Sequence, residues 1–190
     1  ELSIIINQRD PDLLIFNEIL PKRNRAKKKL SAKEFFIDGY DTVIRSTSEG
    51  RGVIIYFKND LRVQSVDILN SHVFNESIWL KIKLQGSDSL LVGNIYRSPS
   101  SSRENNSSLN RLLREAISLK TSHILIVGDF NYGSINWEVQ QTTESFDSCS
   151  STFLESVKDN FLYQHVNEDT RYRAGQSPSR LDLIFSNEAN

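Results

Sequence analysis

Short apolar stretches rich in β-branched residues recur along the chain and alternate with polar turns. Runs of this length and composition predict buried β-strands. We expect strands at residues 13–16, 40–44, 52–57, 61–66, 78–84, 90–96, 124–127 and 180–185. The second and third of these are joined through a short polar segment, and the fifth and sixth are separated by a Gly-containing turn, which predicts a hairpin.

Helical spacing of apolar residues appears in three places. Residues 2–9 read as the end of an amphipathic helix, with Leu2, Ile5 and Ile6 on one side, and residues 109–119 and 151–161 predict two further helices. The Ser/Asn-rich residues 98–108 predict a loop. Because several strands precede each helix, the order does not fit a regular βαβ alternation, and a sandwich of two sheets with helices on its outer faces fits better.

Composition places the chain among globular domains. Its 190 residues are 38% hydrophobic and 25% charged, which suits one domain with a substantial core, spanning residues 1–190. No apolar run is long enough for a membrane span, and no signal peptide is visible, so we expect an intracellular protein without a membrane partner. The single cysteine, Cys149, excludes an internal disulfide and makes a Cys-based zinc site implausible.

A net charge of −1 gives no general attraction to nucleic acid, so any electrostatic contact must be local. One basic cluster lies in residues 22–29 and contains Lys22, Arg23, Arg25, Lys27, Lys28 and Lys29. It has two readings: a solvated loop, or a surface that contacts a phosphate backbone.

The strand at 124–127 ends in Gly128-Asp129-Phe130-Asn131. We expect Gly128 to let the backbone turn sharply and present an acid and an amide at the end of the strand. A capped turn explains these residue types; so does a site that holds a metal-bound phosphate and activates water.

Acids also interrupt or follow two other apolar strands. Glu18, Asp129 and Asp182 occupy comparable positions, and charge is rare in core strands unless it is paired or coordinated. We therefore expect the three carboxylates to converge on one site. Oxygen ligands without clustered Cys or His favour Mg²⁺, with Mn²⁺ or Ca²⁺ as alternatives, over Zn²⁺.

Four segments in this order carry a resemblance to a known family: Asn17-Glu18 after an apolar strand, Ile95-Tyr96-Arg97-Ser98-Pro99, residues 128–131, and residues 180–187. Together they resemble the endonuclease/exonuclease/phosphatase superfamily, which includes deoxyribonuclease I. The chain looks most similar to the endonuclease domains of non-LTR retrotransposons, which also carry a Trp downstream of Gly-Asp-Phe-Asn, here Trp137.

The resemblance implies roles for three residues around a metal-bound phosphate. Glu18 matches the metal-binding glutamate of the family, and Asp129 matches the aspartate that positions or deprotonates the attacking water. Asn131 matches the amide that holds a phosphate oxygen. A hard cation beside a carboxylate and an amide suits in-line attack of water on a phosphodiester.

The resemblance also implies roles for three further residues. Tyr96 matches a tyrosine near the phosphate, Arg97 is a phosphate neighbour, and Asp182 matches the aspartate that orients a catalytic histidine. Each also has an ordinary reading, as a strand aromatic, a surface cation and a partner of Arg180. Trp79 and Trp137 are expected to be packing residues.

The chain also departs from the family pattern. The opening strand with a metal-site asparagine and the closing strand with an Asp-His pair have no counterpart, and His72, His123 and His165 are expected to be structural. The expected fold is therefore α/β (α+β), a four-layer sandwich of two mixed β-sheets flanked by helices and incomplete at both termini. Such a fragment is expected to have weak activity or none.

The leading hypothesis is a Mg²⁺-dependent endonuclease domain that nicks DNA and is linked to a reverse transcriptase. Its partner is then the DNA phosphate backbone, and its location is nuclear if it serves a retrotransposon. Two alternatives stay open: an inactive remnant that acts at most as a binding module, and a phosphoesterase acting on a phospholipid or another small phosphoester.

Overall fold

The computed structural model describes residues 2–20, 32–46, 51–68, 74–175 and 177–189. Three helices, one 3₁₀ turn and eleven strands are formed by these residues. In chain order they are α1 (Leu2–Arg9), β1 (Leu13–Asn17), η1 (Ala32–Phe35), β2 (Tyr40–Arg45), β3 (Val53–Lys58), β4 (Val63–Ser65), β5 (Ser77–Lys83), β6 (Ser89–Tyr96), α2 (Arg103–Ser118), β7 (His123–Asp129), β8 (Ile135–Asn136), β9 (Gln141–Thr142), α3 (Cys149–Asp159), β10 (Tyr163–Gln164) and β11 (Asp182–Ser186).

The strands form two main sheets. The larger has the order β10-β11-β7-β6-β5-β4 and is mixed, because β6 and β7 run parallel while its other neighbours are antiparallel. The smaller has the order β1-β3-β2 and is antiparallel. The two strand pairs expected from sequence, β2–β3 and β5–β6, are both confirmed, and β8 and β9 form a separate two-stranded ribbon.

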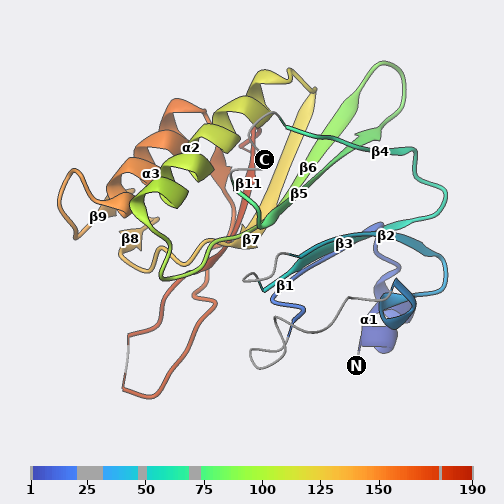
Figure 1. Ribbon diagram of the computed structural model, residues 1–190, viewed down its shortest axis with the longest axis horizontal. Coiled ribbons are helices and arrows are strands. Elements are labelled where there is room, and N and C mark those ends of the chain that lie inside the picture. The colour runs from blue at the N-terminus through green and yellow to red at the C-terminus, as the bar shows by residue number, and fades with distance from the viewer. Residues whose placement is uncertain (1, 21–31, 47–50, 69–73, 176, 190) are drawn as a thin grey trace.

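The elements stack in four layers, as predicted. Figure 1 shows α2 and α3 on one face of the large sheet, the small sheet on the other side, and α1 beyond the small sheet. One core cluster lies between the large sheet and α2 and α3, a second between the two sheets, and a third on the outer face of the small sheet. Trp79 and Trp137 pack in the first cluster, so both are packing residues as expected.

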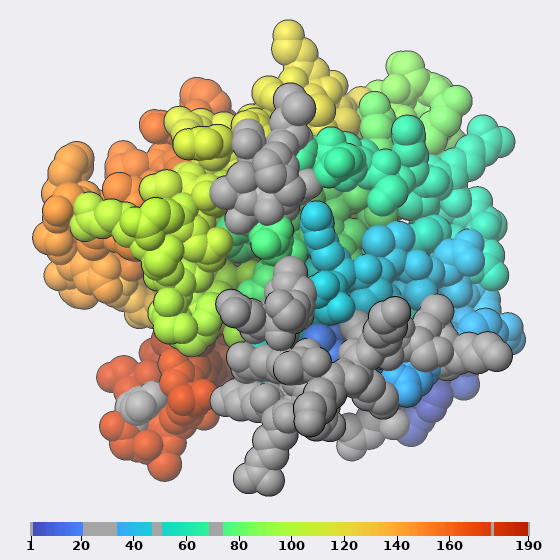
Figure 2. Space-filling view, in the orientation of Figure 1, coloured from blue at the N-terminus to red at the C-terminus, as the bar shows by residue number. Residues whose placement is uncertain are grey.

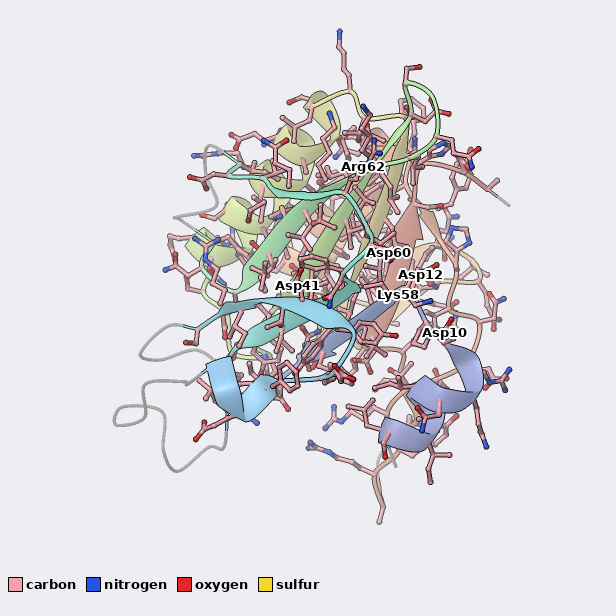
Figure 3. The ribbon with its side chains drawn as sticks, turned by 90° about the vertical axis from the view of Figure 1, so that its right-hand side faces the viewer. Asp10, Asp12, Asp41, Lys58, Asp60 and Arg62 are labelled. Carbon is pink, nitrogen blue, oxygen red and sulfur yellow. The ribbon has the colours of Figure 1, made fainter. Side chains whose placement is uncertain are left out.

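The helix at the start of the chain forms, but it is not buried along one side as its pattern predicted. Among its residues none is buried; Ile4 and Ile5 are more than half exposed, and Ile6 alone packs against the outer face of the small sheet. The turn after α1 is held instead by Lys58, whose Nζ lies 2.9 Å from Asp10 and 3.2 Å from Asp12. Figure 3 shows this group at the end of β3.

The prediction of a loop at 98–108 is wrong over its second half, because α2 begins at Arg103. Ser102 caps the helix by accepting a hydrogen bond from the Asn105 backbone N–H at 3.2 Å. The buried stripe of α2 begins with a polar residue, Asn106, three positions before Leu109. An apolar periodicity search therefore misses the first turn. None of the helices among the described residues is long and apolar enough to cross a membrane.

The prediction of a sharp turn at Gly128 is also wrong. Gly128 is an extended residue inside β7, paired with Ile95 on one side and Leu183 on the other. A Cβ at this position would overlap the carbonyl oxygen of Ile95, so the glycine permits a close approach of strands. The backbone turns at Asn131, which has a left-handed φ of 54°.

Candidate active site

Three of the predicted site residues lie in one row across the large sheet. Tyr96, the last residue of β6, is the register partner of Asp129, the last residue of β7, and Asp129 is the partner of Asp182, the first residue of β11. The sequence placed Tyr96 and Asp129 at strand ends and Asp182 inside a strand, whereas β11 begins at Asp182. The topology then brings these ends together, since β6 and β7 are parallel and β11 is antiparallel to β7.

Glu18 reaches this row from the other sheet. It follows β1, which contacts β6 and β7 (Figure 1), and its Oε1 accepts a hydrogen bond from the Tyr96 hydroxyl at 2.9 Å. Two side-chain amides tie the sheets together here: Asn17 Nδ2 donates to Ile95 O at 3.2 Å, and the buried Asn94 Nδ2 donates to Phe16 O at 3.1 Å. Glu18 is thus joined to the row through Tyr96, and Asp129 and Asp182 are neighbours within it.

The Glu18 side chain is held in a constrained position. Its backbone is left-handed, with a φ of 57°, which costs a non-Gly residue of the order of 1 kcal/mol. Arg51 Nη1 lies 3.1 Å from Glu18 Oε1, and the Arg51 backbone N–H donates to Glu76 Oε1 at 2.6 Å. Sequence reasoning missed Arg51, because it lies in a polar connection with no motif of its own.

Asp129 is the acid with the most strongly shifted pKa in the described part of the chain. Its burial, followed by the nearby negative charge of Asp182 and Glu18, raises its pKa to about 7, although hydrogen bonding with Asn131 acts in the opposite direction. Its Oδ1 is buried and has no hydrogen-bond partner among the described residues. A buried carboxylate oxygen without a donor, beside other carboxylates, is suited to accept a proton or a cation.

Tyr96 stays protonated over the physiological range. Burial raises the pKa of its hydroxyl, and the hydrogen bond to Glu18 raises it further. The hydroxyl therefore acts as a neutral donor that fixes one oxygen of Glu18.

Asp182 is exposed, and its backbone is anchored by Thr170. The Thr170 Oγ1 accepts hydrogen bonds from Leu181 N at 3.1 Å and from Asp182 N at 3.0 Å. This threonine begins a loop that returns at Ser179, and residues 171–175 of the loop project below the helices (Figure 2).

Asn131 and Arg97 contact each other. Asn131 Nδ2 donates to the Arg97 carbonyl oxygen at 2.9 Å, while the Arg97 guanidinium donates to the carbonyls of Phe130 and Asn131, both at 3.1 Å. Arg97 is only 6% exposed, so its guanidinium lies beneath the turn that carries Asn131. Its expected contact with phosphate stays a prediction.

The two histidines among the described residues lie away from the site. His123 contacts Glu188, and His165 Nε2 lies 2.7 Å from Ser186 Oγ, both at the end of β7 and β11 opposite the site. The basic cluster at 22–29 and His72 lie outside the described residues.

The described residues contain no group of three or more His, Cys, Asp or Glu side chains arranged around one point for a metal. Magnesium, however, is commonly held by one or two carboxylates together with waters and substrate phosphate. Glu18 and Asp129 offer hard oxygen donors of this kind, and the unpaired Oδ1 of Asp129 fits such a cation. The site therefore suits Mg²⁺ or Mn²⁺ bound jointly with a phosphate.

Comparison with known proteins agrees with this geometry. Residues 90–190 match the family described as endonuclease-reverse transcriptase. No curated protein sequence shows a significant match to the chain.

Solved structures give the same fold at low identity. The endonuclease domain of TRAS1, a telomere-specific non-LTR retrotransposon, matches with a TM-score of 0.66 and 15% identity, covering 97% of this chain and 76% of that one. The 3′-5′ exonuclease NExo from Neisseria meningitidis matches with a TM-score of 0.64 and 16% identity, covering 97% of this chain and 80% of that one. An AP endonuclease from Archaeoglobus fulgidus matches with a TM-score of 0.61 and 18% identity, covering 96% of this chain and 78% of that one. The family match and the shared fold together show that the chain belongs to the endonuclease/exonuclease/phosphatase superfamily.

Proposed function

We propose that this chain is a divalent-metal-dependent phosphodiesterase domain that nicks DNA. The observation that supports it most is the meeting of Glu18 with the row of Tyr96, Asp129 and Asp182 where the two sheets join. Both the matched family and the TRAS1 neighbour are described as endonucleases, which favours DNA over other phosphoesters.

In this proposal Glu18 and Asp129 hold Mg²⁺ or Mn²⁺. When bound, the cation supplies positive charge that polarises a phosphoryl oxygen and stabilises the leaving alkoxide. The Asp129 carboxylate accepts the proton of the attacking water. The Asn131 amide donates to a phosphate oxygen, and Tyr96 keeps the Glu18 carboxylate in place.

Asp182 acts on the same site through charge. Its carboxylate raises the basicity of Asp129 across the register pair that they form, which favours proton uptake from water. Its family role beside a histidine stays a prediction, since the described histidines His123 and His165 are at the opposite end of β7 and β11.

The partners proposed are DNA, contacted through its phosphate backbone, and a covalently linked reverse transcriptase. The family description supports the second partner, and a nuclear location follows if the protein serves a retrotransposon. The basic cluster at 22–29 follows Glu18 in the sequence and is proposed to contact the backbone near the cut.

A plasmid-nicking assay tests the proposal. We expect supercoiled DNA to be converted to open circles with Mg²⁺ or Mn²⁺, at most weakly by residues 1–190 alone, and not with EDTA, Asp129→Asn or Glu18→Gln. The exposed Asp60→Asn serves as the matched control and should leave the rate unchanged.

Two outcomes contradict the proposal. Absence of nicking by this chain, and by the chain with its natural flanking sequence restored, on any DNA overturns the endonuclease activity. Hydrolysis of a small phosphoester without nicking overturns DNA as the substrate while leaving the metal-dependent chemistry in place.

A further inference from the structure

Arg97 is a buried cation whose recorded hydrogen-bond acceptors are all neutral. Its Nε donates to Asn106 Oδ1 at 2.6 Å, and its Nη1 donates to the carbonyl oxygens of Phe130 and Asn131. The guanidinium also lies 3.9 Å from the centre of the Tyr132 ring. Burying a charge is costly unless its donors are satisfied, and here Asn106 satisfies Nε while the turn after β7 satisfies Nη1.

Asn106 completes this arrangement from the first turn of α2. It is 2% exposed, and its Oδ1 accepts from both Arg97 Nε and the Tyr132 hydroxyl, each at 2.6 Å. Its Nδ2 donates to the carbonyls of Ser101 at 3.2 Å and Ser102 at 2.6 Å. The amide therefore uses its acceptor and both donors, which fixes its orientation.

The arrangement ends at the proposed catalytic groups. The Arg97 backbone N–H donates to Asp129 O at 2.8 Å, and its carbonyl accepts from Asn131 Nδ2 at 2.9 Å. Asn131 has a left-handed backbone, and the Arg97 guanidinium donates to the two carbonyls that flank the Asn131 Cα, those of Phe130 and of Asn131 itself. With Nδ2 directed to Arg97, the Asn131 side chain is fixed by the same residue that fixes its backbone.

We propose that Arg97 and Asn106 are positioning residues that hold Asp129 and Asn131 in the geometry of the reaction. The first turn of α2 then sets the shape of the active-site turn through Asn106, and Arg97 acts beneath the site instead of on the substrate. This inference rests on the proposed phosphodiesterase function.

The test compares Asn106→Leu with Asn105→Leu, the same change one position earlier in the helix. Among the described residues, Asn105 bonds to the serines before α2, with its Nδ2 donating to Ser101 Oγ and its backbone N–H to Ser102 Oγ, and not to the active-site turn. We expect Asn106→Leu to lower kcat for plasmid nicking by about 10²-fold with KM changed less than threefold, since small displacements of catalytic groups have effects of this size. Asn105→Leu should leave both within threefold of the wild type.

A second readout does not depend on activity. In ¹⁵N NMR spectra the Asn131 side-chain amide should show slow hydrogen exchange in the wild type and faster exchange in Asn106→Leu and Arg97→Lys. If Asn106→Leu does not fold, Arg97→Lys and Tyr132→Phe replace it. Tyr132→Phe leaves the Arg97–Asn106 bond in place, so it should reduce kcat less than Arg97→Lys.

The outcomes separate this inference from the proposed function. Lower thermal stability with unchanged kcat per folded molecule and unchanged Asn131 exchange overturns the positioning role. A rise in KM alone in Arg97→Lys also overturns it, since that result places Arg97 on the substrate. If the wild type does not nick DNA, the proposed function fails, while the exchange measurement still tests whether Arg97 and Asn106 hold Asn131.

Discussion

The carboxylate of Asp129 destabilises the fold when it is ionised, and its replacement by Asn is therefore expected to stabilise the protein above neutral pH. Burial and neighbouring acids raise its pKa from an ordinary value of 3.8 to about 7. A difference of this size corresponds to about 4 kcal/mol as an upper limit. The carboxylate is only partly buried, and solvent screening reduces the expected gain to about 1–3 kcal/mol.

The pH dependence follows from the sign of this shift. A carboxyl group whose pKa is higher in the fold than in the unfolded chain prefers to be protonated in the fold. The penalty is absent below about pH 4, increases as pH rises towards 7, and is complete above it. Asp129→Asn should therefore match the wild type in acid and exceed it most at pH 8, where the melting temperature rises by about 2–10 °C.

The assay is thermal or urea unfolding in EDTA at pH 5 and pH 8, with Asp60→Asn as the exposed control. At pH 5 Asp129→Asn should show less than half of the gain in unfolding free energy that it shows at pH 8. The control Asp60→Asn should show no gain at either pH. Addition of Mg²⁺ at pH 8 should stabilise the wild type more than Asp129→Asn, by about 2.7 kcal/mol at a concentration of 100 Kd. Equal or lower stability of Asp129→Asn at pH 8 without metal refutes the reasoning.

Three other changes have defined outcomes. Gly128→Ala should destabilise the fold by about 3 kcal/mol or more, measured by urea unfolding, because its Cβ meets a backbone carbonyl of β6. Thr170→Val removes the acceptor of two backbone N–H groups, and we expect a loss of about 1–2 kcal/mol in the same assay with a lower kcat, since Asp182 loses its anchor; an unchanged kcat contradicts that role. Arg51→Gln should strengthen Mn²⁺ binding by about tenfold in calorimetry, because a cation 3.1 Å from the Glu18 carboxylate repels a divalent ion; weaker Mn²⁺ binding contradicts this.

The apolar periodicity was sufficient to predict most strands and the layered architecture. It failed where a polar residue occupies an internal position, as Asn106 does in α2, and where a glycine serves strand contact instead of a turn, as Gly128 does. Residue types alone do not distinguish these uses, because the deciding atoms come from neighbouring strands.

The site residues at strand ends were predictable because their neighbours in sequence are apolar. Glu18, Asp129 and Asp182 interrupt or follow such runs, and the sheet pairing then brings them together. Arg51 was not predictable, since it lies in a polar connection and acts only through contacts distant in sequence. Arg97 was identified as a site residue, but its direction relative to the turn depends on α2.

The central claim is that Glu18 and Asp129, from different sheets, share one divalent cation in a phosphodiesterase site. Anomalous diffraction from crystals soaked in Mn²⁺ tests it directly. We predict one strong anomalous peak within coordination distance of both carboxylates, lost in Asp129→Asn crystals soaked in the same way. A peak at another position, or none beside Glu18 and Asp129 at saturating Mn²⁺, contradicts the account.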